Sequence, residues 1–487
     1  MNRPESSFRD QAQAWMLFGC LLLAAILTWS QTQFPPQKSE PDNPTTQSEE
    51  TTHRISPKEA EELFRSVDDI LKFASKETGL PIKHTVKRRL TSREEVVDFI
   101  QKGMAKDKDA ERFRRSELVL KKFGLIPPDF NMQKFLVALL REQIAGYYDP
   151  KTKYVNLLDW IDAEQQRPVL AHELTHALQD QSFGLKKWMV TEDPADQRSP
   201  GAADIQNDEI STARQAVVEG QATAVLVDYM LAPAGQSIQS SPQIVEALKA
   251  GMLVGSADSV QLHNAPNFIR EALTFPYRYG LDFEVALLTK AGKEKAYQET
   301  LKNPPISTRQ IMEPDTYLSG ERIAPLSVPD FKHIFKNYDR FDIGSIGEFD
   351  VAMLIDQYAG VKASQKLYPH WRGGYYYAAK PKGDPSAALG LFYISRWSNP
   401  QHASEFAAIY AKSLWKRYKH VHGVPEGSTK PLDDANAIPN LDGRHTWLTE
   451  DGPVIIEVQQ DTVLVTESLD EPTTENLEHA FLASKSN

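Results

Sequence analysis

The segment that most restricts the fold of this chain is VLAHELTHALQDQ, residues 169–181. Its composition is typical of a helix, and the four-residue spacing of His172 and His176 places both imidazoles on one face, one turn apart. Glu173 projects from the edge of the same face. Neutral imidazoles are good ligands for zinc, which needs a further ligand from another segment. The sequence therefore predicts a helix whose histidine face meets a second element that supplies this ligand.

The flanks of this segment add two expectations. Pro168 falls in the first turn of the expected helix, where its missing N–H costs no hydrogen bond. Leu170, Leu174 and Leu178 form a stripe on the face that turns away from the histidines. We therefore expect the leucines to pack inward while the histidine face presents the chemistry.

The third ligand is predicted on the segment ARQAVVEGQATAVLVDYML, residues 213–231. Glu219 is its only carboxylate between residues 213 and 227, and its neighbours at helical spacing are small or apolar. Burying an ionised carboxylate is costly unless a positive partner meets it, and zinc is such a partner. Gly220 beside it suits a close approach of two helices. Glu219 is therefore the expected third ligand.

Two alternatives to this assignment stay open on the sequence alone. Glu219 could form a salt bridge instead, with Arg214, about one turn earlier, as one candidate partner. Another carboxylate could also serve as the ligand. Three candidates lie in a polar, loop-like segment and one lies toward the far end of the helix: Asp204, Asp208, Glu209 and Asp228.

Length and composition limit the class of protein. A chain of 487 residues can form two or three domains, and 41% hydrophobic with 25% charged residues is ordinary for a globular protein. The net charge is −11, and no basic stripe with interleaved aromatics occurs, which argues against nucleic acid as a partner. Cys20 is the only cysteine, so the fold is expected to do without disulfides.

The N-terminus predicts export. Residues 14–29, AWMLFGCLLLAAILTW, carry no charge and follow Arg3 and Arg9. As a helix they would span about 24 Å, slightly less than the roughly 30 Å of a bilayer core. Residues 1–30 are therefore expected to be a signal anchor, which would hold a single-pass protein in the cell membrane, or else a cleaved signal peptide of a secreted or periplasmic protein. The polar, proline-rich residues 31–55 are expected to form a disordered tether.

The pattern beyond residue 56 predicts an α+β fold in two parts, a helix-rich domain at 56–320 and a C-terminal α+β domain at 321–487. A hairpin is expected around the turn signal DPKT, with strands near 144–149 and 153–158. This hairpin could accept an extended peptide along an edge strand. A hairpin with a purely structural role is an open alternative. The other expected elements of the first part are a strand at 84–90 and helices at 57–76, 92–104, 109–123 and 131–143.

The C-terminal part begins with a proline-dotted stretch after Leu301, which is expected to be an extended linker or wrapping loop. Helices at 345–359 and 400–418, a strand at 388–397 and a hairpin at 454–468 are expected to follow. WRGGYYYAAK, residues 371–380, is expected to pack in a sheet, with a stacking surface for a glycan or peptide as the alternative. His420 and His422 lack a neighbour that would complete a metal site.

HELTH followed by an E-G-x-A helix resembles the gluzincin branch of zinc metallopeptidases, the thermolysin-like arrangement. The series YYDPKT, AHELTHALQDQ, ARQAVVEGQAT, FPYRYG and PPISTRQIMEP is similar to a group of exported bacterial and archaeal metallopeptidase-like proteins, over roughly residues 85–406. The resemblance implies a zincin-like domain with one catalytic Zn²⁺. It also implies His172, His176 and Glu219 as ligands and Glu173 as the general base for a metal-bound water.

The same resemblance implies a peptidase that acts on a peptide or protein substrate outside the cytoplasmic membrane. One position departs from the family, because Thr223 stands where thermolysin-like enzymes carry an aspartate that orients a histidine. A hydroxyl can accept an imidazole N–H, although more weakly. The rival interpretation is a catalytically silent zincin-fold module that binds or assembles at the cell surface.

A hydrolase of this kind needs a hydrogen-bond donor for the oxyanion that develops in the transition state. Tyr277 in FPYRYG is the first candidate. Tyr279, His263 and Tyr317 are further candidates, and each of the four could equally be an ordinary core or surface residue.

Overall fold

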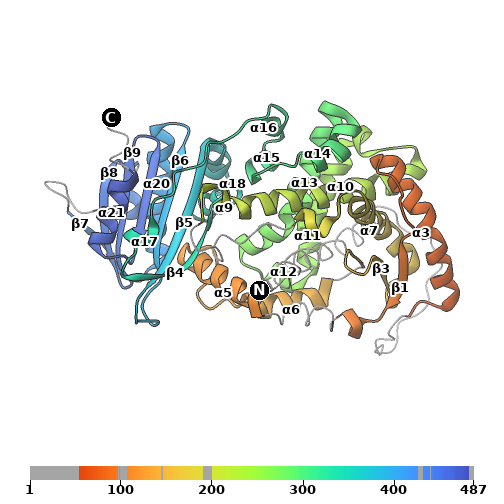
Figure 1. Cartoon of the computed structure of the whole chain (residues 1–487), viewed down its shortest axis with the longest axis horizontal. Helices are drawn as coiled ribbons and strands as arrows, with labels where there is room; N and C mark the ends of the chain where they lie inside the picture. Colours follow the sequence, from red (N-terminus) through yellow and green to blue (C-terminus); the bar gives the residue numbers. More distant parts are fainter. Residues whose placement is uncertain are drawn as a thin grey trace, which may run out of the picture.

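The computed structural model of the chain describes residues 54–96, 98, 107–143, 146–189, 200–425, 432–438 and 440–481. The fold is α+β, as predicted, with a helical region beside a seven-stranded sheet (Figure 1). The expected signal segment at 1–30 and the tether up to residue 53 lie outside the described residues. Within the described part of the chain, no helix is both long and apolar enough to cross a membrane.

The helical region begins with α3 (Pro57–Thr78), which confirms the helix predicted at 57–76. Ser56 and Glu59 form a reciprocal capping box at its start, and Gly79 ends it at a left-handed φ of 69°. The other long helices are α5 (Asp107–Lys122), α6 (Met132–Gln143), α7 (Ala163–Phe183), α10 (Asn207–Leu231), α11 (Pro242–Asp258) and α13 (Asn267–Lys293). Shorter elements of this region are α8 (Leu185–Met189), α9 (Ala202–Ile205), η2 (Ala232–Ala234), η3 (Ile238–Ser240), α12 (Val260–His263), the π-helical turn η4 (Glu294–Glu299) and α14 (Thr300–Lys302).

The predictions for 109–123 and 131–143 are confirmed to within two residues by α5 and α6. The expected helix at 92–104 is described only in part. At its start the backbone N–H of Ser92 donates to the Glu95 carboxylate at 2.9 Å and the Ser92 hydroxyl accepts from Glu95 N at 3.3 Å. Ser92 and Glu95 therefore form a capping box, and their spacing in the sequence is typical of such a helix start.

A small sheet stands next to α7. β2 (Tyr147–Asp149) and β3 (Tyr154–Leu158) form the predicted antiparallel hairpin, with Lys153 at a positive φ of 62° in the turn. β1 (Lys87–Thr91), near the strand expected at 84–90, pairs with β3 in parallel. The strand order β1-β3-β2 leaves β2 at the edge. The expectation of an edge strand just before the histidine helix is confirmed.

α7 differs from its prediction at the N-terminal end. The helix begins at Ala163, so Pro168 lies inside it rather than in the first turn. The proline therefore removes one intrahelical hydrogen bond. Burial of Gln166 explains why the helix extends upstream, because its side chain donates to Leu158 O at 2.9 Å and Ile161 O at 2.7 Å and ties this turn to β3.

α10 and α13 cross in backbone contact. A Cβ on Gly220 of α10 would lie 2.2 Å from the carbonyl oxygen of Gly280 on α13. A Cβ on Gly280 would lie 2.3 Å from the carbonyl oxygen of Ala216. The predicted close approach at Gly220 is therefore confirmed, and it fixes the position of α10 between α13 and α7 (Figure 1).

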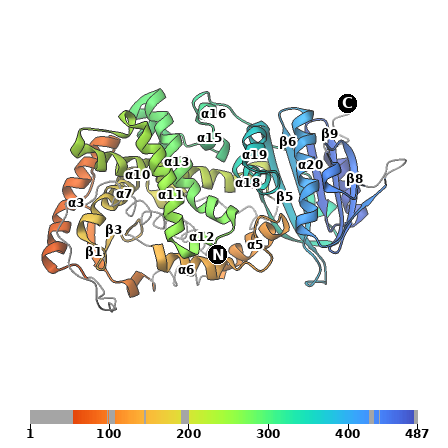
Figure 2. The same cartoon turned by 180° about the vertical axis from the view of Figure 1, so that it is seen from behind.

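The second sheet is antiparallel throughout and has the order β4-β5-β6-β10-β9-β8-β7. Its strands are β4 (Tyr338–Ser345), β5 (Trp371–Pro381), β6 (Gly390–Trp397), β7 (Val421–Val424), β8 (Gly443–Thr449), β9 (Gly452–Gln459) and β10 (Thr462–Glu467). α18 (Glu348–Ala359) and α20 (Pro400–Arg417) pack on one face (Figure 2), and α17 (Phe331–Ile334) and α21 (Glu471–Phe481) pack on the other. The remaining elements are α19 (Val361–Leu367), η5 (Tyr368–His370) and η6 (Ala435–Ala437).

The predicted strand at 388–397, the hairpin at 454–468 and the helices at 345–359 and 400–418 are confirmed with small shifts of their ends. The aromatic residues of β5 pack in the sheet, as expected. Tyr375 and Tyr377 lie on the face that α17 covers, where the Tyr377 ring stacks on Phe331 at 4.3 Å. Tyr376 points to the opposite face and donates to Asp342 at 2.9 Å.

The stretch after Leu301 is only partly an extended loop. It contains two short helices, α15 (Thr308–Met312) and α16 (Pro314–Leu318), so the prediction of a continuous linker is wrong. Pro314 occupies the first position of α16, where a proline favours a helix start. Arg309 anchors α15 by an ion pair of 2.7 Å with the buried Glu348 of α18.

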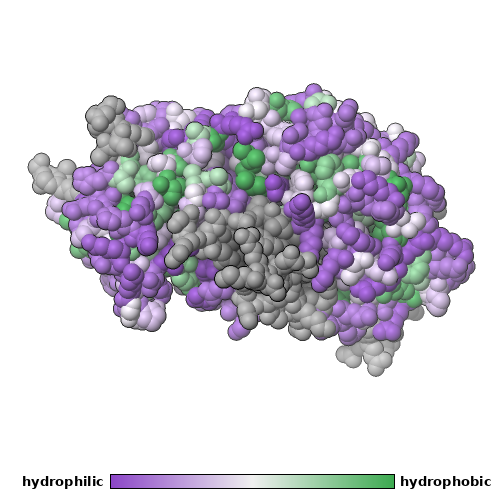
Figure 3. Space-filling model, viewed as in Figure 1, coloured by the Kyte–Doolittle hydropathy of each residue, from purple (hydrophilic) through white to green (hydrophobic). Residues whose placement is uncertain are grey.

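One hydrophobic core extends from the helical region to the sheet face that α18 and α20 cover, and a second lies under α17 and α21. On the face seen in Figure 3, hydrophilic residues cover most of the coloured surface, and hydrophobic residues form small separate areas. The large exposed hydrophobic side chains of the described residues are likewise scattered along the chain: Ile82, Val260, Ile306, Val361 and Leu448.

Candidate metal centre

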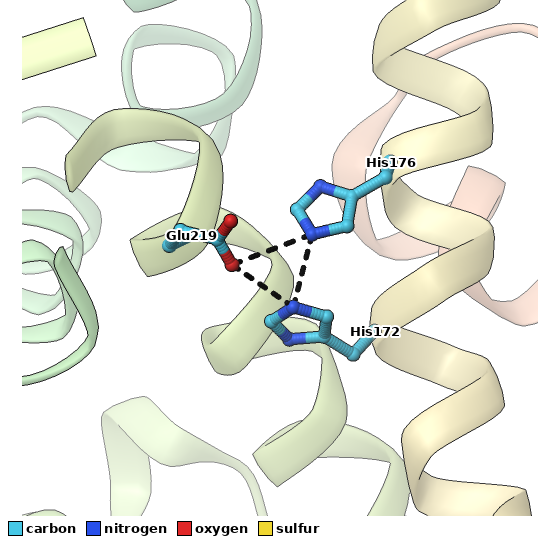
Figure 4. Close-up of side chains that lie close together, drawn as sticks. All are labelled: His172, His176 and Glu219. Carbon is cyan, nitrogen blue, oxygen red and sulfur yellow. Dashed lines mark hydrogen bonds and ion pairs between the residues drawn. The ribbon is translucent and has the colours of Figure 1, made fainter. Parts of the chain in front are cut away.

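α7 and α10 bring three predicted ligands together (Figure 4). The Nε2 atoms of His172 and His176 lie 2.9 Å apart. One carboxylate oxygen of Glu219 lies 3.1 Å from the first and 3.4 Å from the second. All three side chains are buried, with His172 fully enclosed. Within the described ranges, this is the only group of three or more histidine, cysteine, aspartate or glutamate residues that could hold a metal ion.

The separations of these atoms fit a single small ion. Ligand atoms at about 2.0–2.1 Å from a tetrahedral zinc ion are about 3.3–3.4 Å from one another. The three observed separations, from 2.9 to 3.4 Å, lie close to that value. Two imidazoles and one carboxylate are also a donor set that zinc accepts, with one coordination position left for another group.

The Glu219 carboxylate pairs with the two histidines rather than with an arginine. Burial alone would raise its pKa, but the imidazoles of His176 and His172 outweigh burial and hold the pKa at about 2. Arg214 donates to the Trp188 carbonyl at 2.8 Å and lies over the Trp188 ring. Among the ion pairs between described residues, those of Glu219 are with the two histidines alone. The salt bridge to Arg214 is therefore not formed.

The other carboxylates considered as ligands have different roles. Asp204 accepts the N–H of Gly201 at 2.8 Å at the start of α9. Asp228 accepts the N–H of Ile238 at 2.6 Å. Asp208 and Glu209 line a separate cavity near the start of α10.

A chain of hydrogen bonds fixes the ring of His176. Its Nδ1 lies 2.9 Å from Oε1 of Gln179. The Gln179 amide group donates to the Val218 carbonyl at 3.2 Å and to Gln221 Oε1 at 2.9 Å, and Gln221 donates to the Ala296 carbonyl at 2.8 Å. Since carbonyls only accept, both amides are held in one orientation. His176 must therefore carry a proton on Nδ1 when its Nε2 lone pair faces the centre.

His172 lacks such a partner. Its Nδ1 is buried with no hydrogen-bond partner, and the hydroxyl of Thr223 is buried in the same condition. A hydroxyl can accept an imidazole N–H, but the hydroxyl of Thr223 does not accept one from His172 in this structure. Burial and the neighbouring His176 lower the pKa of His172 to about 4.

Glu173 is held from one side only. Its Oε2 accepts the backbone N–H of Tyr148 on β2 at 2.6 Å, while Oε1 is buried without a hydrogen-bond partner. Burial raises the pKa of Glu173 to about 7, with His176 opposing and Glu219 adding to the shift. The edge strand thus orients the carboxylate and leaves its second oxygen able to exchange a proton near neutral pH.

Of the four candidate oxyanion donors, Tyr277 lies beside the candidate ligand His172. Its ring lies nearly parallel to the His172 ring, with centroids 6.3 Å apart, and it is buried. Tyr279 packs against Phe275, and Tyr317 donates to the Asn303 carbonyl at 2.7 Å. His263 is exposed.

Several residues that support the site were not predicted from the sequence. Gln179 follows His176 by three residues, so its place on the same helical face was available from the spacing. Gln221 and Tyr148 act from other elements, and only the packing of α7 against α10 and β2 reveals them. Asp180 on α7 supports β2 and its turn, because its carboxylate accepts hydrogen bonds from the Tyr148 hydroxyl at 2.7 Å and from Lys153 at 2.5 Å.

Comparison with known proteins adds no relative: no family model, curated protein or solved structure matches this chain.

Proposed function

We propose that the chain is a zinc-dependent peptidase that acts outside the cytoplasmic membrane. His172, His176 and Glu219 are the ligands, and Glu173 transfers the proton. The observation that carries this proposal is the meeting of three metal-ligating atoms within 3.4 Å of one another, next to a carboxylate with one free oxygen. A zinc ion held there would supply Lewis acidity, which polarises a carbonyl group and lowers the pKa of water.

Glu173 has the properties of a general base. Oε1 accepts a proton from the attacking water, while the Tyr148 N–H keeps Oε2 in place. With a pKa of about 7, the carboxylate can take up the proton and then deliver it to the leaving amine. Both steps use the same oxygen, so the side chain does not need to change its orientation.

β2 is the element along which a peptide substrate would lie. It is an edge strand, and its Tyr148 touches Glu173 directly. An extended peptide that adds to such an edge uses its backbone hydrogen bonds, so its carbonyl groups would pass beside Glu173. This arrangement favours cleavage within an extended segment of a peptide or protein.

Tyr277 is assigned the donor role for the oxyanion. The stacking of its ring on His172 keeps the phenol close to the ligands, in a buried setting where a hydrogen bond to a developing charge is strong. Its replacement by phenylalanine keeps the ring and removes only the hydroxyl. Hydrolysis should then slow by about 100-fold or more while the zinc content stays unchanged.

A second candidate function is a metal-holding module without turnover. The unpartnered Nδ1 of His172 favours it, because a catalytic zinc site usually orients each imidazole through such a bond. The two functions share the metal site and differ in the need for Glu173.

The experiment that tests the proposal is metal analysis of the purified full chain, paired with cleavage of casein and of a peptide library. One zinc per chain and cleavage that a chelator abolishes and zinc restores are expected. Glu219→Ala should lose both, whereas Glu475→Ala, an exposed carboxylate on α21, should keep both. Full metal content in Glu219→Ala would remove this residue from the ligand set.

A further inference from the structure

A cavity of about 330 Å³ lies where the helical region meets the large sheet. α5, α6 and α13 contribute apolar lining, which includes Leu120, Leu136, Phe268 and Leu273. The N-terminal end of α10, the end of β4 and the start of α18 also line the cavity. The cavity therefore has the size and apolar wall of a small-ligand site.

Part of the cavity lining is acidic, with carboxylates from α10, β4 and α18. Asp208, Glu209, Asp342 and Asp350 line it, and the described residues that line it include no lysine, arginine or histidine. Asp342 has a positive neighbour, because Arg115 lies 3.6 Å from it. Burial raises the pKa of Glu209 to about 8, and Asp350 and Asp208 add to that shift. The carboxylates thus repel one another, and a cation would relieve this cost.

Two glycines make room for these carboxylates. A Cβ on Gly347 would lie 1.8 Å from an oxygen of Glu209, and a Cβ on Gly344 would lie 2.7 Å from an oxygen of Asp208. Glu209 is also fixed by Thr308, whose backbone N–H and hydroxyl both donate to its Oε2 at 2.9 Å. The acidic groups therefore occupy defined positions at the cavity wall.

The acidic cluster does not suit a metal ion. Among the described residues, only His172, His176 and Glu219 form a group whose ligand atoms lie close enough together to hold a metal ion. The cluster lines an apolar cavity instead, so the matching ligand has a positively charged group joined to an apolar body. An ammonium group, with three donors, fits several carboxylates at once.

The cavity and the metal centre share one face of α10. Asp208, Thr212 and Gln215 line the cavity and precede Glu219 by eleven, seven and four residues. Eleven residues of helix measure about 16 Å, which an extended peptide spans with about five residues. On the α13 side, Pro276 lines the cavity and the next residue, Tyr277, stacks on His172.

We propose that this cavity binds an apolar part of the substrate that carries an ammonium group, from an amino terminus or a lysine side chain, about five residues from the bond that is cleaved. The identification of the ligand as a peptide rests on the proposed function. The preference for an apolar cation rests on the cavity alone. Glu209 and Asp350 contact the ammonium group, and the wall formed by α5 and α13 contacts the apolar body.

The binding test uses 4-phenylbutylamine and 4-phenylbutanol, which share one skeleton and differ in charge. Titration calorimetry on the detergent-solubilised full chain should show the amine binding at least about tenfold more tightly than the alcohol, as expected for a charge-assisted hydrogen bond. Equal binding of the two compounds, or binding of neither, overturns the proposal.

Two variants locate the ligand. Glu209→Gln should weaken binding of the amine by about tenfold and leave binding of the alcohol unchanged. Ala272→Phe, which fills the cavity from its apolar wall, should abolish binding of both compounds. Glu475→Gln is the matched control, because the same chemical change is made on an exposed residue of α21. Unaltered amine binding in Ala272→Phe would contradict the proposal even if Glu209→Gln failed to fold.

A competition assay separates this inference from the proposed function. If the chain cleaves peptides, the amine should inhibit cleavage, and peptides with a free amino terminus or a lysine should be cleaved faster than their acetylated or norleucine counterparts. Cleavage without inhibition or preference overturns the cavity's role alone. Selective binding of the amine by a chain that cleaves no peptide leaves the cavity site intact and overturns the peptidase proposal.

Discussion

The Nε2 atoms of His172 and His176 lie 2.9 Å apart, although both imidazoles are buried. Two nitrogen lone pairs at this distance repel each other unless a proton or a metal ion lies between them. The Glu219 carboxylate faces both nitrogens and adds a negative charge. The three groups therefore create a site that is stable only with a cation in it, and this cation is a proton or a metal ion according to the conditions.

Zinc binding should release about one proton near pH 7.5. Burial lowers the pKa of His176, but the Glu219 carboxylate outweighs burial and raises it to about 9, so the metal-free imidazole is protonated at neutral pH. Because zinc displaces that proton, zinc affinity should rise with pH and level off above about pH 9. Calorimetry in buffers of different ionisation enthalpy measures the proton count. A count of zero at pH 7.5 would contradict the assignment of His176.

Gln179→Met should lower zinc affinity by about 10- to 100-fold with little change in fold. Methionine has a similar volume but offers no strong acceptor for the Nδ1 proton of His176, so the ring loses its fixed tautomer and orientation. Competition with a chromogenic chelator measures the affinity. Gln181→Met, on a nearby residue outside the ligand network, is the control and should leave zinc affinity unchanged.

Thr223→Asp should strengthen zinc binding, by about tenfold or more. The longer carboxylate reaches further from α10 and can accept the Nδ1 proton of His172, which has no partner in the native chain. Without zinc, the added buried charge should lower thermal stability. Chelator competition and melting curves with and without zinc measure both effects. An affinity equal to that of the native chain would show that the two side chains do not meet.

Gly220→Ala should destabilise the fold by about 1–3 kcal/mol, because the added methyl group would meet the Gly280 carbonyl. The separation of α10 from α13 should displace Glu219 as well, so zinc affinity should fall together with stability. Urea unfolding measures the free energy. Gly201→Ala, where a Cβ meets its nearest atom at 3.5 Å, is the control and should change stability little.

The parts of the fold that depend on local pattern could be predicted from the sequence. Apolar spacing, caps and turn residues predicted α3, α7 and the β2–β3 hairpin, and the isolated carboxylate in an apolar helix indicated Glu219 as a ligand. α15 and α16 were missed because short helices between prolines carry little periodicity and depend on tertiary contacts such as the Arg309–Glu348 ion pair.

The surroundings of the site could not be predicted in the same way. The ligand set follows from spacing within two helices, whereas the orientation of His176 depends on Gln221 and a carbonyl of η4, which come from distant segments. That Nδ1 of His172 and the hydroxyl of Thr223 are both buried without a partner is likewise visible only in the folded chain. Such contacts are set by how α7, α10 and α13 pack, and no local pattern encodes them.

Comparison of Glu173→Gln with the native full chain, for zinc content and peptide cleavage, tests whether Glu173 transfers the proton in a zinc-dependent cleavage. Glutamine keeps the shape and can still accept the Tyr148 N–H, but it cannot take up a proton from water. We expect one zinc per chain in both proteins and at least a 100-fold loss of cleavage in the variant. Cleavage at the native rate by a zinc-loaded Glu173→Gln chain would contradict the role of Glu173 as the general base.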